Sequence, residues 1–371
     1  MRSLRTLWML VFLCLSVSAA GAAWVPVQPG ARVGQPIGVS LVSATAQTTT
    51  IETVVHGLNM EPVSESNLDL VKLDIPGAGL LTDTGDPQVP VVRTYIAVPF
   101  DADVTVEVRD VESVRIGTQT VWPAQPQYKR SEPKPPFTMN PDRYSERSPF
   151  PSQLARITDD VIMRDFRVVT LEIAPVQYLA ADSSLEIASR MSIDVRATGG
   201  TTMGPDRVFP SFYRLYQNHI LNFSRLGIGQ RSDAEPMLII AHDAFIPALD
   251  SFVEWKTKRG IDVTVVPTST TGITATQVQS YIQTVYNTWN PKPVYVILVG
   301  DSPQINPLIG IESCASDYLF TLLAGSDHVP DVFISRFVAL NLNELNPQLD
   351  KLMHYETQPD NTLWLDRLCG I

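Results

Sequence analysis

The stretch VYVILVGD, residues 294–301, decides the fold of the second half of the chain. Seven apolar or small residues run without interruption into Asp301, and valine and isoleucine favour strands. A continuous apolar run indicates a strand buried on both faces, as in a parallel sheet covered by helices. Sites in such sheets gather beyond the carboxyl ends of the strands. The stretch therefore predicts a central parallel strand with Asp301 at a candidate site.

Strands and helices alternate on both sides of this stretch. Further apolar runs are MLIIA (237–241), IDVTVV (261–266) and DVFISRF (331–337), and Thr274 with Gln277 forms a capping box. The apolar residues that share one side of three helical patterns are Phe245, Leu249, Phe252 and Val253, then Val278, Tyr281, Ile282, Val285 and Trp289, and finally Leu345, Leu349, Leu352 and Met353. This order predicts an α/β domain over residues 236–371, with helices on both faces of a parallel sheet.

The preceding part of the chain has a different periodicity. Over residues 51–197 apolar and polar residues alternate, which indicates strands with one solvent-exposed face. The stretch AADSS (180–184) separates two such runs and predicts a hairpin connection. We expect an antiparallel β-sandwich over 51–197, preceded by a small, polar, flexible leader (23–50) and followed by a linker (198–235).

A proline-rich loop, residues 121–152, interrupts the alternating pattern. It carries eight prolines between Pro123 and Pro151, a composition that does not pack as a regular element. Its basic residues are Lys129, Arg130, Lys134, Arg143 and Arg147. Three interpretations stay open: a solvated loop, a strap over a partner surface, or a proteolytic processing site.

The N-terminus has the features of a signal peptide. Arg2 and Arg5 precede LWMLVFLCLSV (7–17), an apolar stretch too short to span a bilayer, and small residues then allow cleavage after Ala22. A retained anchor is the alternative. We expect residues 1–22 to be removed and the protein to be secreted or exposed at the cell surface, with no membrane contact after signal removal.

Charge and cysteine content narrow the function classes. The net charge of −11 and the absence of a basic stripe argue against nucleic acid and against an anionic membrane surface as partners. Cys14 leaves with the signal, so only Cys314 and Cys369 remain. Two cysteines do not make a disulfide framework, and whether they pair or stay free is left open by the sequence.

The stretch AGSDHVPDVFISRF, residues 324–337, sets two carboxylates on a short loop before a strand. Asp327 and Asp331 repel each other unless water or a cation screens them. If Asp301 converged on them, carboxylate and carbonyl oxygens would suit Ca²⁺. The alternatives are aspartates that only form the turn and a phosphate-receiving Asp301 with Mg²⁺, which fits an exported protein poorly. Gly325 permits the turn, and His328 points to water.

A nucleophilic pair is hard to assemble from the residues present. His56-Gly57 and Cys369-Gly370 suggest a Cys/His dyad, but His56 lies in the β region and Cys369 on a strand that has only begun. A working pair needs rigid support of both members. His242, after the strand MLIIA, could contact a substrate but has no evident partner.

An ordered set of motifs resembles the gingipain family of cysteine endopeptidases. LDIPGAGLLTDTGDPQVPVVRTYIAVPFDADVTVEV and FRVVTLEIAPVQY followed by LEIASRMSIDVR look like the family's β-sandwich propeptide. FVEWKTKRGIDVTVV, VYVILVGD, SDYLFTLLAGSDHVPDVFISRF and HYE look like the opening of its caspase-like catalytic domain. The resemblance implies a secreted cysteine-type peptidase precursor that acts in proteolysis on protein or peptide substrates. It also implies contact between propeptide and catalytic domain.

The family's site residues carry over only in part. The resemblance implies a structural calcium site with Asp301, Asp327 and Asp331 as side-chain ligands and with Ala324 and Val329 binding through their carbonyls. The family's catalytic His and Cys lie on later strands, so we expect no catalytic residue in this chain. The chain is then an N-terminal fragment of a precursor and inactive alone. Its expected fold is mixed, a β-sandwich propeptide followed by a partial α/β domain. The alternative is a non-catalytic exported calcium-binding or inhibitory module.

Overall fold

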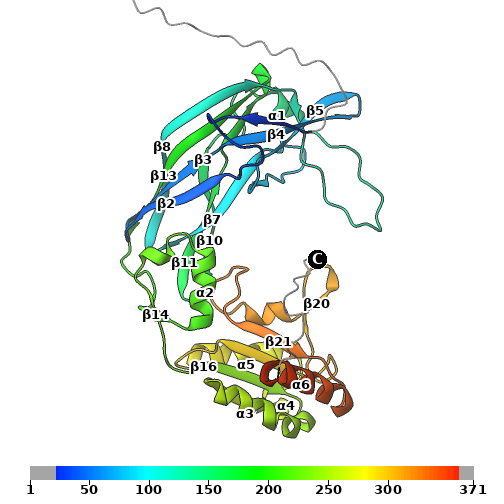
Figure 1. Cartoon of the computed structure of the whole chain (residues 1–371). Coiled ribbons are helices and arrows are strands. Elements are labelled where there is room, and N and C mark those ends of the chain that lie inside the picture. Colours follow the sequence, from blue (N-terminus) through cyan, green and yellow to red (C-terminus); the bar gives the residue numbers. More distant parts are fainter. Residues whose placement is uncertain (1–21, 359–371) are drawn as a thin grey trace, which may run out of the picture.

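The computed structural model describes residues 22–358, so the predicted signal peptide, apart from its last residue, lies outside the described part of the chain. Antiparallel sheets form one end of the molecule and a parallel sheet with helices forms the other (Figure 1). The predicted mixed fold is therefore confirmed. Residues of β10, β11 and α2 lie between the two ends, along one side of the molecule (Figure 1).

The N-terminal domain consists of three sheets whose strands pair antiparallel except at one short edge. Their orders are β1-β4-β5-β9, β10-β11-β7-β6 and β12-β13-β3-β2, with β8 paired to β13. The strands are β1 (Ala23–Pro26), β2 (Gly38–Ala44), β3 (Thr48–Val54), β4 (Gly57–Glu65), β5 (Leu68–Asp74), β6 (Gly79–Leu80), β7 (Pro90–Val98), β8 (Ala102–Gly117), β9 (Thr120–Val121), β10 (Ala155–Met163), β11 (Phe166–Ile173), β12 (Val176–Leu179) and β13 (Ser184–Gly199). The predicted hairpin connection is the short 3₁₀ turn η1 (Ala180–Asp182) between β12 and β13.

The predicted flexible leader is instead part of the sheets. β1 pairs antiparallel with β4, and β2 pairs with β3. The side chain of Val27 is buried and Thr49 is only 4% exposed. Threonine and valine are β-branched and pack well on a pleated surface, so the small, polar composition of residues 23–50 is compatible with strands.

The predicted linker also carries a packed helix. Residues 198–235 contain β14 (Arg207–Val208), α2 (Pro210–His219), the 3₁₀ turn η2 (Phe223–Arg225) and β15 (Gly229–Gln230). Pro210 stands at the first helical position, where proline is favoured. Phe212, Tyr216 and Phe223 are buried with Phe166 of β11 in one aromatic cluster. This cluster connects the sandwich to the α/β domain.

The α/β domain has a parallel sheet in the order β17-β16-β18-β21. Two apolar cores lie on its two faces, one against α5 and the other against α3 and α6. Its elements are β16 (Glu235–Ala241), η3 (Asp243–Leu249), α3 (Asp250–Lys258), β17 (Ile261–Pro267), α4 (Thr268–Thr271), α5 (Ala275–Thr288), β18 (Tyr295–Val299), β19 (Leu308–Ile309), η4 (Ile311–Ser313), β20 (Ala315–Ser316), η5 (Asp317–Thr321), β21 (Phe333–Phe337) and α6 (Leu342–Thr357). The capping box of Thr274 and Gln277 starts α5 as predicted. Between residues 22 and 358 no helix is long and apolar enough to cross a membrane.

Candidate functional site

The carboxyl edge of the parallel sheet holds Asp301, as the sequence predicts. Its backbone N–H donates to Ala339 O at 3.0 Å, and its Oδ1 accepts from Ser302 N at 2.7 Å. On the neighbouring strand His242 and Asp243 follow β16. Main-chain contacts thus hold Asp301 at the end of β18.

Asp243 is the most strongly perturbed acid at this edge. Its carboxylate accepts from Ser269 Oγ at 2.5 Å, from Ser269 N at 3.0 Å and from Thr268 Oγ1 at 2.8 Å. The hydroxyl of Ser269, and then that of Thr268, stabilises the charged form and lowers the pKa of Asp243 to about 2. These bonds join the ends of β16 and β17.

The structure does not bring Asp301 to the other two predicted ligands. β21 runs parallel to β18, with Tyr295 opposite Phe333 and Val299 opposite Phe337. Asp331 precedes β21 whereas Asp301 follows β18, so they lie at opposite edges, separated by at least the length of β18, about 16 Å. Within residues 22–358 no three His, Cys, Asp or Glu side chains gather in a way that could hold a metal ion.

Asp327 and Asp331 lie on what we call the aspartate loop, residues 323–331, at the amino edge of the sheet. Gly325 is at φ +73°, the left-handed region that favours glycine, and a Cβ there would meet Asp327 Oδ2 at 2.5 Å. Gly325 thus permits the turn, as expected. Burial raises the pKa of Asp331, and the nearby Asp327 charge adds to the effect.

Backbone N–H groups occupy both carboxylates of the aspartate loop. Asp331 Oδ2 accepts from Leu323 N at 2.8 Å and Ala324 N at 2.6 Å, and Asp327 Oδ1 accepts from Val329 N at 2.8 Å. Ala324 and Val329, expected to offer carbonyl oxygens to a cation, instead present their N–H groups to the aspartates. These contacts satisfy part of the acceptor capacity of the two acids from within the loop.

The remaining donors come from the N-terminal domain. Ile162 N donates to Asp327 Oδ2 at 2.8 Å, and Arg164 N donates to Asp331 Oδ1 at 3.1 Å. Ile162 is the last residue but one of β10, and Arg164 lies in the two-residue turn between β10 and β11. The tip of this hairpin therefore docks directly on the aspartate loop.

Arg164 is a buried cation at the centre of this contact. Its side chain is 3% exposed. Nη1 donates to Asp331 O at 2.6 Å and to Pro293 O at 2.7 Å, and the guanidinium lies 4.5 Å from the centre of the Phe212 ring. A guanidinium presents five donors in a rigid fork, which suits several carbonyls at once. Arg164 thus joins the starts of β18 and β21 to the sandwich.

The aspartate loop, in this arrangement, does not fit a bound calcium ion. Calcium sites take six to eight oxygen ligands, but here N–H donors face the carboxylate oxygens of Asp327 and Asp331. The guanidinium of Arg164 adds a positive charge beside the loop. Calcium binding at these residues stays a prediction, and its third side-chain ligand, Asp301, lies at the other edge of the sheet.

No Cys/His pair is evident in the described part of the chain. The only cysteine between residues 22 and 358, Cys314, is exposed. His56 lies between β3 and β4 of the sandwich, where its carbonyl accepts from Val27 N at 2.9 Å. Cys369 lies outside the described residues. The expectation that neither His56 nor Cys369 is catalytic stays a prediction.

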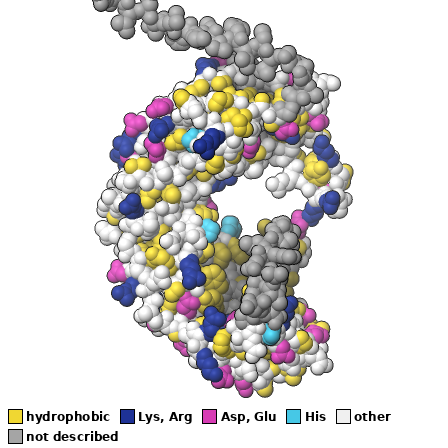
Figure 2. Space-filling view, viewed as in Figure 1, with side chains coloured by type: hydrophobic (Ala, Val, Ile, Leu, Met, Phe, Trp, Pro, Cys, Tyr) yellow, Lys and Arg dark blue, Asp and Glu magenta, His cyan; other side chains and the backbone are white. Residues whose placement is uncertain are grey.

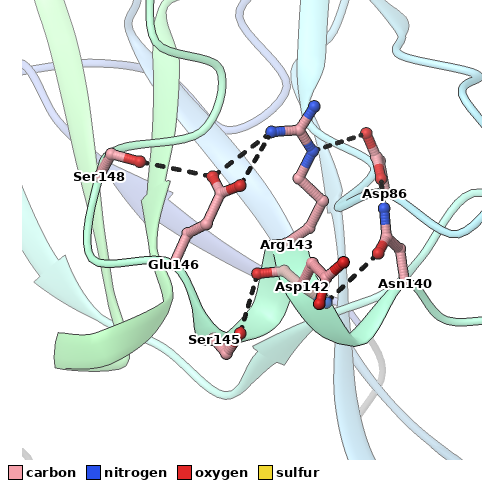
Figure 3. Close-up of polar contacts among 7 residues, drawn as sticks. All are labelled: Asp86, Asn140, Asp142, Arg143, Ser145, Glu146 and Ser148. Carbon is pink, nitrogen blue, oxygen red and sulfur yellow. Dashed lines mark hydrogen bonds and ion pairs between the residues drawn. The ribbon is translucent and has the colours of Figure 1, made fainter.

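The proline-rich loop is anchored at one end and exposed at the other. Around the short helix α1 (Pro141–Ser145), Arg143 pairs with Asp86 at 3.2 Å and with Glu146 at 3.1 Å, and Asn140 donates to Asp86 at 2.8 Å (Figure 3). Residues 127–134, by contrast, are exposed. The predicted exposed loop therefore has a fixed base.

The exposed end of the loop reaches the α/β domain. Lys129 Nζ lies 2.9 Å from Glu312 Oε1, in the segment between β18 and β21, and both side chains are about half exposed. Figure 2 shows the loop on one side of an open space between the two domains. This exposed ion pair thus adds to the contacts that the buried hairpin tip and the aromatic cluster around α2 make between the domains.

Comparison with known families matches the two halves separately. A model described as "Peptidase family C25" matches residues 230–371, and one described as "Propeptide_C25" matches residues 28–207. The boundary between the two matches falls in the segment that carries α2.

Individual relatives are distant. Gingipain R1 of Porphyromonas gingivalis is 27% identical over 286 residues, 74% of this chain and 29% of its own length. Lys-gingipain of the same organism (strain ATCC 33277) is 28% identical over 310 residues, 78% of this chain and 18% of its own length. The chain thus spans less than a third of either relative. The solved structure "Complex of Porphyromonas gingivalis RgpB pro- and mature domains" is similar at a TM-score of 0.46, with 22% identity, over 50% of this chain and 97% of that one.

Proposed function

The chain belongs to peptidase family C25 and carries that family's propeptide, and from this premise we propose that it serves as the latent precursor of an exported cysteine endopeptidase. The peptidase reaction would cleave protein or peptide substrates. Latency would come from the propeptide, which stays docked on the α/β domain until it is removed. Residues 1–22 would direct export and be cleaved after Ala22.

The hairpin contact is the observation that carries this function. A propeptide that only assisted folding would need no buried charged group across the boundary. Here Arg164, from the propeptide match, is buried against Pro293 and Asp331 of the peptidase match. Burying a guanidinium is costly unless its donors are satisfied. An arrangement this specific supports a propeptide held in one fixed position.

The proline-rich loop supplies a second part of the proposal, as a strap that limits access from the side of the hairpin β19–β20. Lys129 and Arg130 lie in its exposed stretch, and proline keeps such a stretch extended. A half-exposed ion pair with Glu312 is weak enough to open. The same residues would therefore serve first as cover and then as a processing site.

The test is made on the complete gene product. We expect purified precursor to be inactive and to gain peptide hydrolysis, blocked by thiol alkylation, once the strap is cleaved. The chain of 371 residues alone should show no hydrolysis, since no Cys/His pair is evident among the residues 22–358. Absence of thiol-dependent hydrolysis from the complete, processed product would instead favour a non-catalytic inhibitory module, and hydrolysis by the 371-residue chain would refute its inactivity.

A further inference from the structure

A cleft of about 500 Å³, which we call the neutral cleft, lies in the N-terminal domain at the base of the proline-rich loop. One of its walls is the segment between β6 and β7, and the other is the segment that follows β9. The residues that line it are Thr82, Thr84, Gln88, Trp122, Ala124, Gln125 and Gln127. None of these side chains is charged, although the chain has a net charge of −11. A cleft of this size is in the range of small-molecule sites.

Hydrogen bonds hold the two walls of the neutral cleft together. Gln88 N donates to Trp122 O at 2.9 Å. Ala124 N donates to Asp86 O, also at 2.9 Å. The Asp86 carboxylate is held in turn by Asn140, the N-cap of α1, whose Nδ2 donates to it at 2.8 Å (Figure 3). The cleft is therefore preorganised, so a ligand would not have to order its walls on binding.

Four polar side chains of the neutral cleft make no hydrogen bond to any other residue in the range 22–358. They are Thr82, Thr84, Gln88 and Gln127. Their hydroxyl and amide groups both donate and accept hydrogen bonds. The partly exposed ring of Trp122 lies beside them, with the ammonium group of Lys72 at 4.7 Å from its centre. The cleft thus offers hydrogen bonds and aromatic contact to the same ligand.

The lining disfavours three other classes of ligand. A phosphate or carboxylate ligand calls for a cationic partner, and none of the described residues that line the cleft is Lys, Arg or His. A wholly apolar ligand would remove water from the hydroxyls and amides without replacing its hydrogen bonds. An extended peptide binds through unpaired main-chain groups, but the N–H groups of Gln88 and Ala124 are already paired. Pro87 and Pro123, which face each other across the two walls, have no N–H group.

We propose that the neutral cleft binds a neutral carbohydrate. A sugar ring has C–H groups that pack against an aromatic side chain and hydroxyls that pair with amides and other hydroxyls. Trp122 would supply the aromatic contact, and Thr84 and Gln88 would supply hydrogen bonds from the two ends of one wall. The cleft lies within the residues matched by the propeptide model. Its ligand is therefore independent of the proposed peptidase reaction, and a bound glycan would tether the chain to the surface that carries it.

The test applies the full chain to an array of immobilised neutral oligosaccharides of glucose, galactose, mannose and N-acetylglucosamine. We expect binding to at least one of them, with a Kd below about 1 mM when the same oligosaccharide is titrated in solution by calorimetry. A neutral glycine-serine peptide is titrated in parallel. Absence of binding to every neutral oligosaccharide overturns the proposal. Binding of the peptide alone overturns it too and would assign the cleft to peptides.

Variants connect the binding to the neutral cleft. Thr84→Ala and Gln88→Ala should each weaken binding about fivefold, the effect of losing one hydrogen bond. Neither side chain is buried, so both variants should keep the free energy of unfolding of wild type, measured in urea. Gln47→Ala, which removes an exposed glutamine between β2 and β3, should leave the Kd unchanged. Equal Kd values for wild type, Thr84→Ala and Gln88→Ala would show that the sugar binds elsewhere and would overturn the proposal.

Discussion

At the scale of single residues, Arg164 stabilises the contact through geometry as much as through charge. Its guanidinium donates to carbonyls of Asp331, Pro293 and Lys292 and packs against the Phe212 ring. These acceptors are main-chain oxygens at fixed positions. An ammonium group donates from a single nitrogen and does not reproduce the planar set of donors with which the guanidinium reaches these carbonyls.

Arg164→Lys should therefore destabilise the protein although the charge is kept. Loss of two hydrogen bonds from a charged donor is expected to lower the free energy of unfolding by about 3 kcal/mol. Urea unfolding followed by fluorescence measures this. Arg156→Lys, on the same hairpin but half exposed, should change it by less than about 1 kcal/mol. Equal losses in the free energy of unfolding for Arg164→Lys and Arg156→Lys would contradict the role of the planar guanidinium of Arg164.

Asp243 offers a residue-scale prediction on pH. Its pKa of about 2 lies below the value of about 3.9 in an unfolded chain. A lowered folded-state pKa stabilises the fold above the unfolded value, and that stability is lost as pH falls from about 4 toward 2.

Removing the Ser269 hydroxyl, the main hydrogen-bond donor to Asp243, should shift the pH range in which this stability is lost. In Ser269→Ala the pKa of Asp243 should rise toward its usual value, because the hydroxyl that stabilises the carboxylate is gone. Carbon-detected NMR titration of the Asp243 carboxyl reads the change. Ser251→Ala, on the exposed side of α3, serves as the control. If Asp243 still titrated near pH 2 in Ser269→Ala, the Ser269 hydroxyl would not be what lowers its pKa.

At the scale of elements, the aromatic cluster around α2 decides how the domains connect. Phe212 is buried and stacks on Tyr216, and its ring centre lies 4.8 Å from that of Phe333 at the start of β21. Phe166 brings β11 into the same cluster. One helix thus contacts the sandwich and the parallel sheet together, which explains why residues 198–235 are not a simple linker.

Phe212→Ala should destabilise this junction strongly. Truncating a buried phenylalanine costs about 3–5 kcal/mol, and the cavity would lie beside Arg164. Denaturant unfolding should show that loss, with higher hydrogen exchange at the hairpin tip. Val338→Ala, whose side chain is half exposed, should cost less than about 1 kcal/mol. If Phe212→Ala also lowered the free energy of unfolding by less than about 1 kcal/mol, the aromatic cluster would not support the junction.

Apolar periodicity predicted the parallel sheet because strands buried on both faces need continuous apolar runs, as in β18. The same topology separates Asp301 from Asp331, since one residue follows a parallel strand and the other precedes its neighbour. The position of Asp301 at a strand end was therefore predictable, and so was its distance from the aspartate loop. The contacts of Ile162 and Arg164 were not, because main-chain donors are the same in every residue except proline.

At the scale of the whole molecule, the hairpin tip and the proline-rich loop make two contacts of unequal strength between the domains, beside the aromatic cluster around α2. The hairpin tip is buried and makes several hydrogen bonds, whereas Lys129 and Glu312 form one half-exposed ion pair. Exposed pairs contribute about 0–1 kcal/mol and weaken with salt. The proline-rich loop should therefore open while the hairpin tip stays docked.

Opening of the loop is measurable by limited proteolysis. In Glu312→Gln, and in wild type at about 1 M salt, where the screening length falls to about 3 Å, trypsin should cut after Lys129 or Arg130 several-fold faster. The free energy of unfolding should stay within about 0.5 kcal/mol of wild type, because only an exposed pair is lost. Asp262→Asn, an exposed substitution on β17, should leave the cleavage rate unchanged. A cleavage rate that changes neither in Glu312→Gln nor at high salt would mean that the ion pair does not hold the loop. The hairpin tip and the aromatic cluster around α2 would then connect the domains without it.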